Sequence, residues 1–412
     1  MNIAIVGAGV IGVTTAYELA DDGHAVTVFE RHSAAAEEAS FAAAGVIAPG
    51  HLAGWATSAT PEASAGWPPP WGQLAWARAA RRGRHSPLRR EARGQAQRLA
   101  VHSRDRLHAL TQSLQLEYDC SPGYLLLYRG ERERRRAQPW LEALRQAEVR
   151  FEELSPEAAR AIEPALNPSQ DFAGAVHLPD DGVANCRQFA QLLRRHAQAR
   201  GARFEFGCTV LPLDPAAPAL LRLQGPTGPD SRRFDAVVVC AGLASAALLR
   251  PVGLRLPLAP VWGQTVTATI GEPMNAPLSA LRDEQHQVDI TRLGERVRVS
   301  GGARLGEAGA AKDAALTRTL YQVLQDWFPA AARLAGDYVT VQEWQGARPT
   351  LPDGAPVLGA SGAPGVWLNL GHGANGWSMA CGSARALADS LAGREPAVDL
   401  AALGPHRLRS AG

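Results

Sequence analysis

Lysine is almost absent from this chain. Lys312 is the only lysine, although lysine and arginine together number 42. The phosphate-binding motif GxxxxGK[ST] therefore does not occur, and Schiff-base chemistry would depend on Lys312, which lies in an alanine-rich stretch with a helical pattern. Arginine must supply any fixed positive charge at a reactive site.

Cysteine is scarce and scattered. The five cysteines are Cys120, Cys186, Cys208, Cys240 and Cys381, and no two of them have CxxC spacing. This pattern predicts neither a disulfide framework nor a metal site, and it favours a reducing compartment.

Long apolar runs and a strong net charge are also missing. No run approaches the roughly 20 apolar residues of a membrane-spanning helix. A net charge of +2 argues against nucleic acid as a partner. With 46% hydrophobic and 20% charged residues, the 412 residues are expected to form a soluble protein of two domains, or three if length is taken literally. Because an apolar strand begins at residue 2, we expect no signal peptide and a cytoplasmic location.

A glycine loop opens the chain. Residues 2–6 read as a strand, residues 13–22 as a helix and residues 25–29 as a second strand. The loop between the first strand and the helix consists of Gly7, Ala8, Gly9, Val10, Ile11 and Gly12 and matches the GxGxxG pattern. Framed in this way, the loop predicts a dinucleotide-binding site. The alternative is a glycine-rich turn that binds nothing.

The residue types in this loop suit that chemistry. Gly7 permits a sharp turn, Gly9 lets the backbone approach a pyrophosphate, and Gly12 lets the helix pack closely on the strand. The N-terminus of the helix presents N–H groups to phosphates. Glu30 ends the second strand, about 20 residues after the loop, where an acidic side chain binds a ribose with both hydroxyls free.

Two stretches after Glu30 are unusual in composition. Residues 33–50 contain few bulky side chains, which suggests backbone pressed against a ligand; a short alanine-rich helix is the alternative. Residues 51–94 are rich in tryptophan, proline and arginine. Because indole rings and cations suit lipid headgroups, this stretch indicates peripheral contact with the inner face of a membrane, although a packed loop and helix can have the same composition.

Two kinds of strand follow. Residues 234–242 form an apolar run that ends in Ala241 and Gly242, which is typical of a central parallel strand buried on both faces. Residues 256–270 and 287–302 alternate as antiparallel strands do. We therefore expect an α/β fold with an added antiparallel sheet. A discontinuous nucleotide domain would cover residues 1–80, 150–250 and 345–412, and an inserted substrate domain residues 81–149 and 251–344.

A second glycine loop lies near the carboxyl end. A strand over residues 366–370 leads into the loop 371–376, and residues 377–391 continue as a helix. The loop lacks the GxGxxG form. A helix N-terminus directed at a flavin would stabilise the negative charge of the reduced ring, which explains the loop. A plain strand–turn–helix that closes the sheet is the alternative.

Two arginines are candidates for holding a carboxylate. Arg348 lies in residues 346–354, a predicted loop dense in turn-forming residues, and Arg292 ends a strand of the inserted domain. A pair of guanidinium groups can grip a carboxylate bidentately. The alternative is that both are ordinary surface charges.

These segments together resemble the D-amino acid oxidase superfamily of flavoproteins, and within it the D-amino acid dehydrogenase branch. The resemblance runs along nearly the whole chain. It is carried by the first loop with Glu30, residues 40–50, 122–128 and 163–166, and most specifically by residues 346–359 and 369–382. Residues 51–94 depart from the family pattern, as does Ala184-Asn185-Cys186 in place of Gly-Asp-Cys.

The resemblance implies a Rossmann-type, glutathione-reductase-like domain that binds FAD non-covalently, with an inserted mixed or antiparallel sheet domain for the substrate. It implies FAD contacts from the 7–12 loop, Glu30, Arg31, Ala39, Ser40, Ala44, Gly45, Val46, Val210, Ala241, Gly242, Gly346, Arg348, Pro349, Thr350, Gly371, His372, Gly373, Ala374, Asn375 and Gly376. Arg292 and Arg348 match positions that hold the substrate carboxylate in related glycine oxidases.

The implied reaction is oxidative deamination of a D-amino acid to a 2-oxo acid and ammonia. Hydride would pass from Cα to flavin N5, and the electrons would continue to a quinone or another acceptor. Three alternatives stay open: an oxygen-using oxidase of glycine or sarcosine, a catalytic subunit of a hetero-oligomeric dehydrogenase, and an NAD-dependent dehydrogenase or non-catalytic nucleotide-binding protein. The last of these gives the terminal glycine loop and the Arg348 segment no role.

Overall fold

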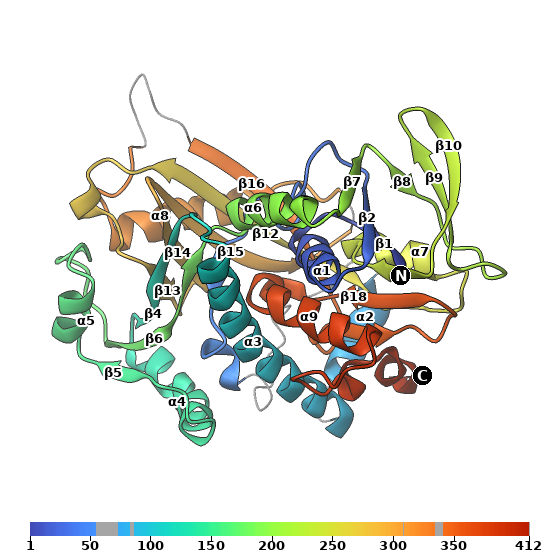
Figure 1. Ribbon diagram of the computed structural model, residues 1–412. Helices are drawn as coiled ribbons and strands as arrows, with labels where there is room; N and C mark the ends of the chain where they lie inside the picture. Colours follow the sequence, from blue (N-terminus) through green and yellow to red (C-terminus); the bar gives the residue numbers. More distant parts are fainter. Residues whose placement is uncertain (55–72, 83–85, 308, 334–340, 412) are drawn as a thin grey trace.

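Two large sheets organise the molecule (Figure 1). The computed structural model describes residues 1–54, 73–82, 86–307, 309–333 and 341–411. The α-helices among them are α1 (Val10–Asp21), α2 (Leu74–Arg82), α3 (Pro87–Ser113), α4 (Glu131–Gln146), α5 (Pro156–Ile162), α6 (Cys186–Ala199), α7 (Ser245–Leu249), α8 (Ala314–Trp327) and α9 (Gly376–Leu391).

The first sheet has six strands in the order β17-β18-β11-β1-β2-β7. Their bounds are β1 (Asn2–Val6), β2 (Ala25–Glu30), β7 (Arg203–Phe206), β11 (Ala236–Val239), β17 (Val357–Ala360) and β18 (Val366–Leu370). Neighbouring strands are parallel except for β17 and β18. As predicted, β11 is buried and lies between β1 and β18 in the middle of the sheet.

Both faces of this sheet are covered, because successive side chains of a strand point to opposite faces. Ile3 and Ile5 of β1 pack in one core cluster with residues of α1, α6 and α9. Ala4 and Val6 pack in a second cluster, which includes side chains of a small sheet formed by β8 (Thr209–Val210), β9 (Leu220–Gly225) and β10 (Gly228–Arg233).

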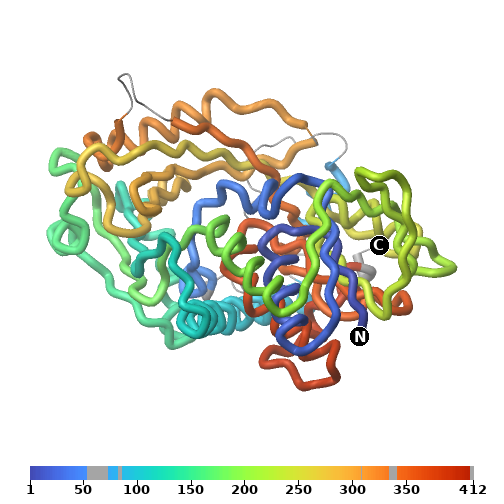
Figure 2. Tube along the Cα trace, turned by 45° about the horizontal axis from the view of Figure 1, so that its top comes forward, coloured from blue at the N-terminus to red at the C-terminus, as the bar shows by residue number. Residues whose placement is uncertain are grey.

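The second sheet has nine strands, in the order β16-β12-β15-β14-β13-β4-β6-β3, with β5 paired to β6. Their bounds are β3 (Val46–Ile47), β4 (Cys120–Tyr128), β5 (Glu152–Leu154), β6 (Gly174–Ala184), β12 (Ala259–Thr269), β13 (Ala280–Asp283), β14 (Val288–Leu293), β15 (Arg296–Leu305) and β16 (Val341–Thr350). Figure 2 shows the two sheets from a second direction.

The two faces of the nine-stranded sheet have different neighbours. On the face that we call outer, Ile290 and Val299 belong to one core cluster with Leu320 and Trp327 of α8. On the opposite face, which we call inner, Thr291 donates a hydrogen bond from Oγ1 to the carbonyl oxygen of Ala44 at 2.9 Å. The inner face therefore meets the small-residue segment that follows β2.

The predicted combination of an α/β domain with a mixed or antiparallel sheet is confirmed, and the sheet is mixed because β13 and β4 pair in parallel. The structure corrects the domain boundaries. β5 and β6 fall in the segment 150–250, which was expected in the nucleotide domain, yet they belong to the nine-stranded sheet. α3 falls in the predicted substrate segment 81–149, yet it packs along α9. Residues 346–350, expected in a loop, continue β16 and pair with β12. Local composition does not specify which distant strand or helix a segment will join.

Candidate functional site

The first glycine loop has the shape that its sequence predicts. Gly7 has a φ of 101°, a conformation that favours glycine, and its N–H donates to the carbonyl oxygen of Phe29 at 2.8 Å. A Cβ on Gly12 would lie 1.9 Å from the carbonyl oxygen of Gly7, so only glycine fits there. A Cβ on Gly9 would lie 3.6 Å from Ser40 Oγ, its nearest contact. Gly12 is therefore required for the close packing of α1 on the loop, whereas Gly9 has no such contact and leaves space beside its Cα.

A pocket borders this loop and the start of α1. It combines residues from β2, the segment after β2, β8, and the end of β11. Of the residues predicted to contact the cofactor, Gly7, Gly9, Val10, Ile11, Glu30, Arg31, Ala39, Ser40, Val210, Ala241, Gly242 and Pro349 line it. The structure therefore brings residues from the segments 6–40, 208–248 and 347–349 together around one pocket. The other predicted contacts, among them Ala44 to Val46 and the loop 371–376, are not among the residues that line it.

Polar side chains hold the edges of this pocket in place. The Glu30 carboxylate accepts hydrogen bonds from the N–H groups of Ala8 at 2.7 Å and His32 at 2.9 Å. Ser40 Oγ accepts the N–H of Val10 at 3.2 Å. Arg31 forms an ion pair with Glu38 at the exposed rim. Glu30 thus points at the loop, where the sequence places a ribose-binding acid.

The surroundings of Gly9 and Gly12 predict different effects of an added methyl group at the two positions. Gly9→Ala should fold normally, because its Cβ meets only an ordinary contact, but it should raise the dissociation constant for FAD at least about tenfold by filling the space that a pyrophosphate needs. Gly12→Ala should destabilise the fold itself, because its Cβ overlaps the oxygen of Gly7. Thermal unfolding of the apoprotein and titration with FAD separate the two effects.

Gly94→Ala is the control for these variants, since a Cβ there meets nothing within 4 Å. It should leave both the melting temperature and FAD binding close to those of the original chain. A Gly9→Ala protein that binds FAD as tightly as the original chain would rule out close approach of a ligand at this position.

The carboxyl-terminal loop lies at the other end of the predicted cofactor site. His372 pairs with Thr350 of β16 through an isolated bridge, and a Cβ on Gly373 would touch the Thr350 side chain at 3.5 Å. α9 follows the loop and packs along α1. Ser378 of α9 accepts the N–H of Ala48 at 3.3 Å. The terminal turn therefore meets both β16 and the segment 44–48.

His372 is an uncharged member of this loop. Its side chain is buried, and burial lowers the pKa of His372 to about 3. The imidazole therefore stays neutral at physiological pH. It contributes no positive charge to the site, so any charge stabilisation there must come from backbone N–H groups or arginine.

Arg348 lies on the inner face of the nine-stranded sheet. It pairs in register with Val261 of β12, and its Nη1 donates to the carbonyl oxygen of Gly302 at 3.0 Å. A Cβ on Gly263 would lie 2.6 Å from Nη2 of Arg348. Gly263 and Gly302 thus make room for the guanidinium group. Ala347 and Pro349, its neighbours along β16, line the dinucleotide pocket.

Arg292 does not join this arrangement, which corrects the sequence-based expectation. It follows Thr291, which points to the inner face, so the side chain of Arg292 points to the outer face. There its Nε donates to the carbonyl oxygen of Gly294 at 3.2 Å and its Nη1 to that of Pro273 at 3.3 Å. A one-residue step along a strand exchanges the two faces, and the sequence did not reveal which face meets the cofactor loops.

Arg298, which the sequence analysis did not single out, occupies the inner face instead. It pairs with Thr291, donates from Nη1 to the carbonyl oxygen of Ala43 at 2.7 Å and from Nε to Thr267 Oγ1 at 3.0 Å. Burial lowers the pKa of Arg298 to about 10, which still leaves it charged at neutral pH. The feature of the sequence that points to Arg298 is its place between two apolar residues of a strand, Val297 and Val299.

Arg298 and Thr291 together anchor the Ala43–Ala44 turn to the nine-stranded sheet. We expect Arg298→Met to lower the free energy of unfolding by about 1.5–3 kcal/mol, because a charge-assisted hydrogen bond to the Ala43 carbonyl is lost. FAD binding should weaken as well, since Ala44, Gly45 and Val46 are predicted contacts. Arg296→Met, at an exposed position of the same strand, is the control. Equal stability of the two variants in denaturant titrations would contradict the anchoring role.

Among the described residues, no group of three or more histidine, cysteine, aspartate or glutamate side chains is arranged to hold a metal ion. Cys381 is buried within α9, and burial raises its pKa well above the usual value. Such a thiol is unreactive, which suits non-covalent binding of a cofactor.

Comparison with known proteins shows which family this chain resembles. The family model described as FAD dependent oxidoreductase matches residues 2–390. The chain is 38% identical to D-amino acid dehydrogenase of Cereibacter sphaeroides over 432 aligned positions, which cover 100% of this chain and 96% of that protein. It is 37% identical to D-amino acid dehydrogenase of Bradyrhizobium diazoefficiens, with 98% of each chain covered.

Solved structures have the same fold at lower identity. Glycine oxidase from Geobacillus kaustophilus superposes with a TM-score of 0.76 at 24% identity, covering 98% of this chain and 97% of that one. L-proline dehydrogenase from P. horikoshii superposes with a TM-score of 0.75 at 16% identity, covering 99% and 98%. At these identities the superpositions establish the fold and not the substrate.

Proposed function

Because this chain belongs to the family of FAD dependent oxidoreductases, we propose that it catalyses the FAD-dependent oxidative deamination of D-amino acids to 2-oxo acids and ammonia. The preference for D-amino acids rests on relatives named D-amino acid dehydrogenase, which match along nearly their whole length. The observation that carries the reaction is the position of Arg348. Its guanidinium group lies beside Gly263 and Gly302 on the inner face, the same face on which Arg298 and Thr291 hold the segment 43–44, and β16 itself borders the pocket through Ala347 and Pro349.

The pocket residues fit FAD. Gly7 and Gly12 form a turn with no room for side chains, and the start of α1 borders the pocket through Gly9, Val10 and Ile11. These N–H groups and the helix dipole suit a pyrophosphate, and Glu30 suits the adenosine ribose. When bound, FAD supplies the two-electron acceptor for the hydride that leaves Cα.

The protein's own contribution is to bind and orient the substrate. Arg348 would hold the carboxylate through two charge-assisted hydrogen bonds, which fixes the direction of the Cα–H bond. Alignment of this kind contributes about 7–11 kcal/mol to lowering a barrier. Hydride leaves Cα as the lone pair of the neutral amine forms the C=N bond, so no side-chain base is needed. The iminium ion that forms then reacts with water to give the oxo acid and ammonia, which leaves in its protonated form.

We further propose that the electrons pass to a quinone or another carrier and not mainly to oxygen. This acceptor would be reached at the inner face of the cytoplasmic membrane, through peripheral contact by residues 51–94. The tryptophan and arginine content of that stretch supports the contact. Trp55, Trp67 and Trp71 lie outside the described residues.

Trp76 is the tryptophan of this stretch that lies among the described residues. Its side chain is 6% exposed, and its Nε1 donates to the carbonyl oxygen of Thr350 at 3.1 Å. Trp76 therefore packs α2 against β16 and is not available to a membrane. In the part of the chain that the structure describes, no helix combines the length and apolar character needed to span a bilayer.

The reaction is tested by anaerobic bleaching of the flavin absorbance. The purified, yellow protein is mixed with D- and L-amino acids, glycine and sarcosine, and is then reoxidised with air or with a soluble quinone. We expect bleaching by D-amino acids and faster reoxidation by the quinone. Bleaching by glycine or sarcosine with rapid reoxidation in air would instead identify an oxygen-using amine oxidase. A colourless protein that stays inactive when FAD is added would refute both.

A further inference from the structure

A second pocket lies on the outer face of the nine-stranded sheet, the face opposite to the predicted cofactor loops. It is lined by residues from the start of β4, the end of α5, β6 and the segment that leads into β13. His177 of β6 pairs in register with Leu125, which belongs to the core cluster of α8 and so points to the outer face. None of the residues that line this pocket lines the dinucleotide pocket.

Glu163 provides a buried carboxyl group in this pocket. Its residue is 4% exposed, and its Oε2 accepts the N–H of Leu278 at 2.9 Å. Oε1 is buried and makes no hydrogen bond to the described residues. Burial raises the pKa of Glu163 to about 7, although the N–H groups of Leu278 and Ala165 and the positive charge of Arg292 act against this rise, so the carboxyl group is partly ionised at neutral pH. A buried carboxylate oxygen without a donor is costly and favours a ligand that donates hydrogen bonds.

His177 supplies a second polar group. Its Nδ1 is buried without a partner, and burial lowers the pKa of His177, which keeps the ring neutral. A neutral imidazole carries one nitrogen that accepts a hydrogen bond. Gly123 has a φ of 92°, and a Cβ there would lie 3.2 Å from Nε2 of His177. The glycine therefore leaves room beside the ring.

The unpartnered polar atoms of Glu163 and His177 are acceptors, and both residues line a small pocket that is partly open to solvent. An ammonium group carries a positive charge and only donors, so it complements a carboxylate together with a neutral imidazole. We propose that this pocket is a second binding site for a small molecule that bears a protonated amino group, held by Glu163 and His177. The ammonium ion and a small amino acid share this chemistry. The site is independent of the reaction proposed above.

The test is a shift in melting temperature of the FAD-loaded protein. The probes are ammonium chloride and 2-aminoisobutyrate, an amino acid that has no Cα–H bond and cannot be dehydrogenated. Sodium chloride at equal ionic strength is the reference. A probe at about 100 times its Kd should raise the melting temperature by about 2 °C or more in the original chain and not in Glu163→Gln.

Arg348→Ala controls for binding at the reactive site, because it should keep the full shift. A response to 2-aminoisobutyrate alone identifies an amino acid as ligand, and a response to ammonium alone identifies the ion; both support the site. If Glu163→Gln does not fold, His177→Leu, at a partly exposed position, decides instead and should reduce the shift. No shift in the original chain would mean that the pocket binds neither probe. An equal shift in the folded variant would mean that the probe binds elsewhere. Either result overturns the proposal.

Discussion

Replacing Arg348 by alanine is expected to lower kcat/KM for D-amino acids by at least about a hundredfold. The guanidinium group would make two charge-assisted hydrogen bonds to the substrate carboxylate, each contributing about 1.5 kcal/mol or more. The loss of about 3 kcal/mol corresponds to roughly two powers of ten in rate. Steady-state rates with an artificial electron acceptor measure it, and the flavin absorbance shows whether FAD is retained.

Two further variants make this prediction specific. Arg348→Lys keeps the positive charge but loses the bidentate geometry, so its kcat/KM should lie between those of alanine and arginine. Arg292→Ala removes an arginine from the outer face, where it binds the carbonyl oxygens of Pro273 and Gly294, and should change kcat/KM less than about threefold. A large loss in Arg292→Ala with normal rates in Arg348→Ala would reverse the assignment.

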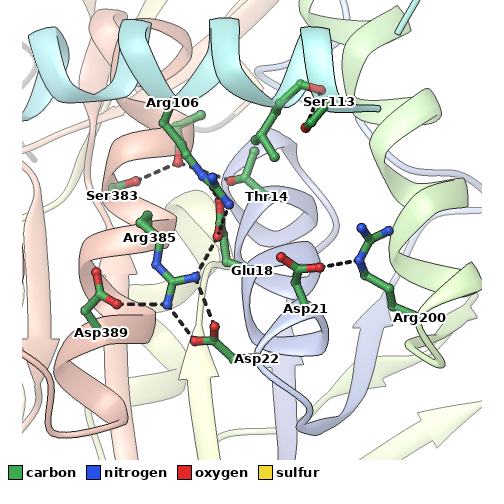
Figure 3. Close-up of polar contacts among 12 residues, drawn as sticks. Thr14, Glu18, Asp21, Asp22, Arg106, Ser113, Arg200, Ser383, Arg385 and Asp389 are labelled. Atoms are coloured by element: carbon green, nitrogen blue, oxygen red, sulfur yellow. Dashed lines mark hydrogen bonds and ion pairs between the residues drawn. The ribbon is translucent and has the colours of Figure 1, made fainter. Parts of the chain in front are cut away.

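Glu18→Ala is expected to destabilise the fold by about 3–5 kcal/mol, a large share of the stability of most domains. Glu18 of α1 is fully buried and accepts hydrogen bonds from Arg106 of α3 at 2.7 and 2.8 Å and from Arg385 of α9 at 2.8 Å (Figure 3). Without the carboxylate, the guanidinium group of Arg106 loses its acceptors on α1, while that of Arg385 keeps its ion pairs with Asp22 and Asp389.

The measurement is denaturant unfolding of the apoprotein. Asp21→Asn is the matched control on the same helix, because Asp21 pairs with Arg200 at a position exposed to solvent and should contribute less than about 1 kcal/mol. FAD binding should also weaken in Glu18→Ala, since α1 carries the first glycine loop. A change in unfolding free energy no larger than that of Asp21→Asn would show that the junction of α1, α3 and α9 does not depend on this ion cluster.

Much of the dinucleotide pocket could be predicted because its physical requirements are local. A strand, a turn with no room for side chains, a helix N-terminus and an acid follow one another within residues 2–30, and steric contact such as that between Gly12 and Gly7 allows few other residues. The same holds for α8 (Ala314–Trp327), whose buried residues recur with a helical period and whose first turn is capped by Asp313. Short-range patterns of this kind need no knowledge of the rest of the chain.

The arginines illustrate what the sequence left open. Arg292 and Arg298 lie on neighbouring antiparallel strands of the nine-stranded sheet, Arg292 between Thr291 and Leu293 and Arg298 between Val297 and Val299. Both faces of that sheet are covered, the outer one by α8 and the inner one by residues 43–45, so hydrophobic alternation could not indicate which face meets the cofactor loops. The register of β14 with β15 and the contact of Thr291 with Ala44 determine that Arg298, and not Arg292, lies on the face that meets the predicted cofactor segment.

By itself the sequence determined the first glycine loop with Glu30 at the end of the following strand, the terminal helix with its glycine turn, and the family. Those features depend on steric and hydrogen-bonding demands between residues close in the chain. Only the tertiary structure decided that β6 joins the substrate sheet, that α3 packs on α9, and that Arg348 and Arg298 face inward while Arg292 faces outward. These outcomes depend on pairing between segments far apart in sequence, where a shift of one residue reverses every side chain.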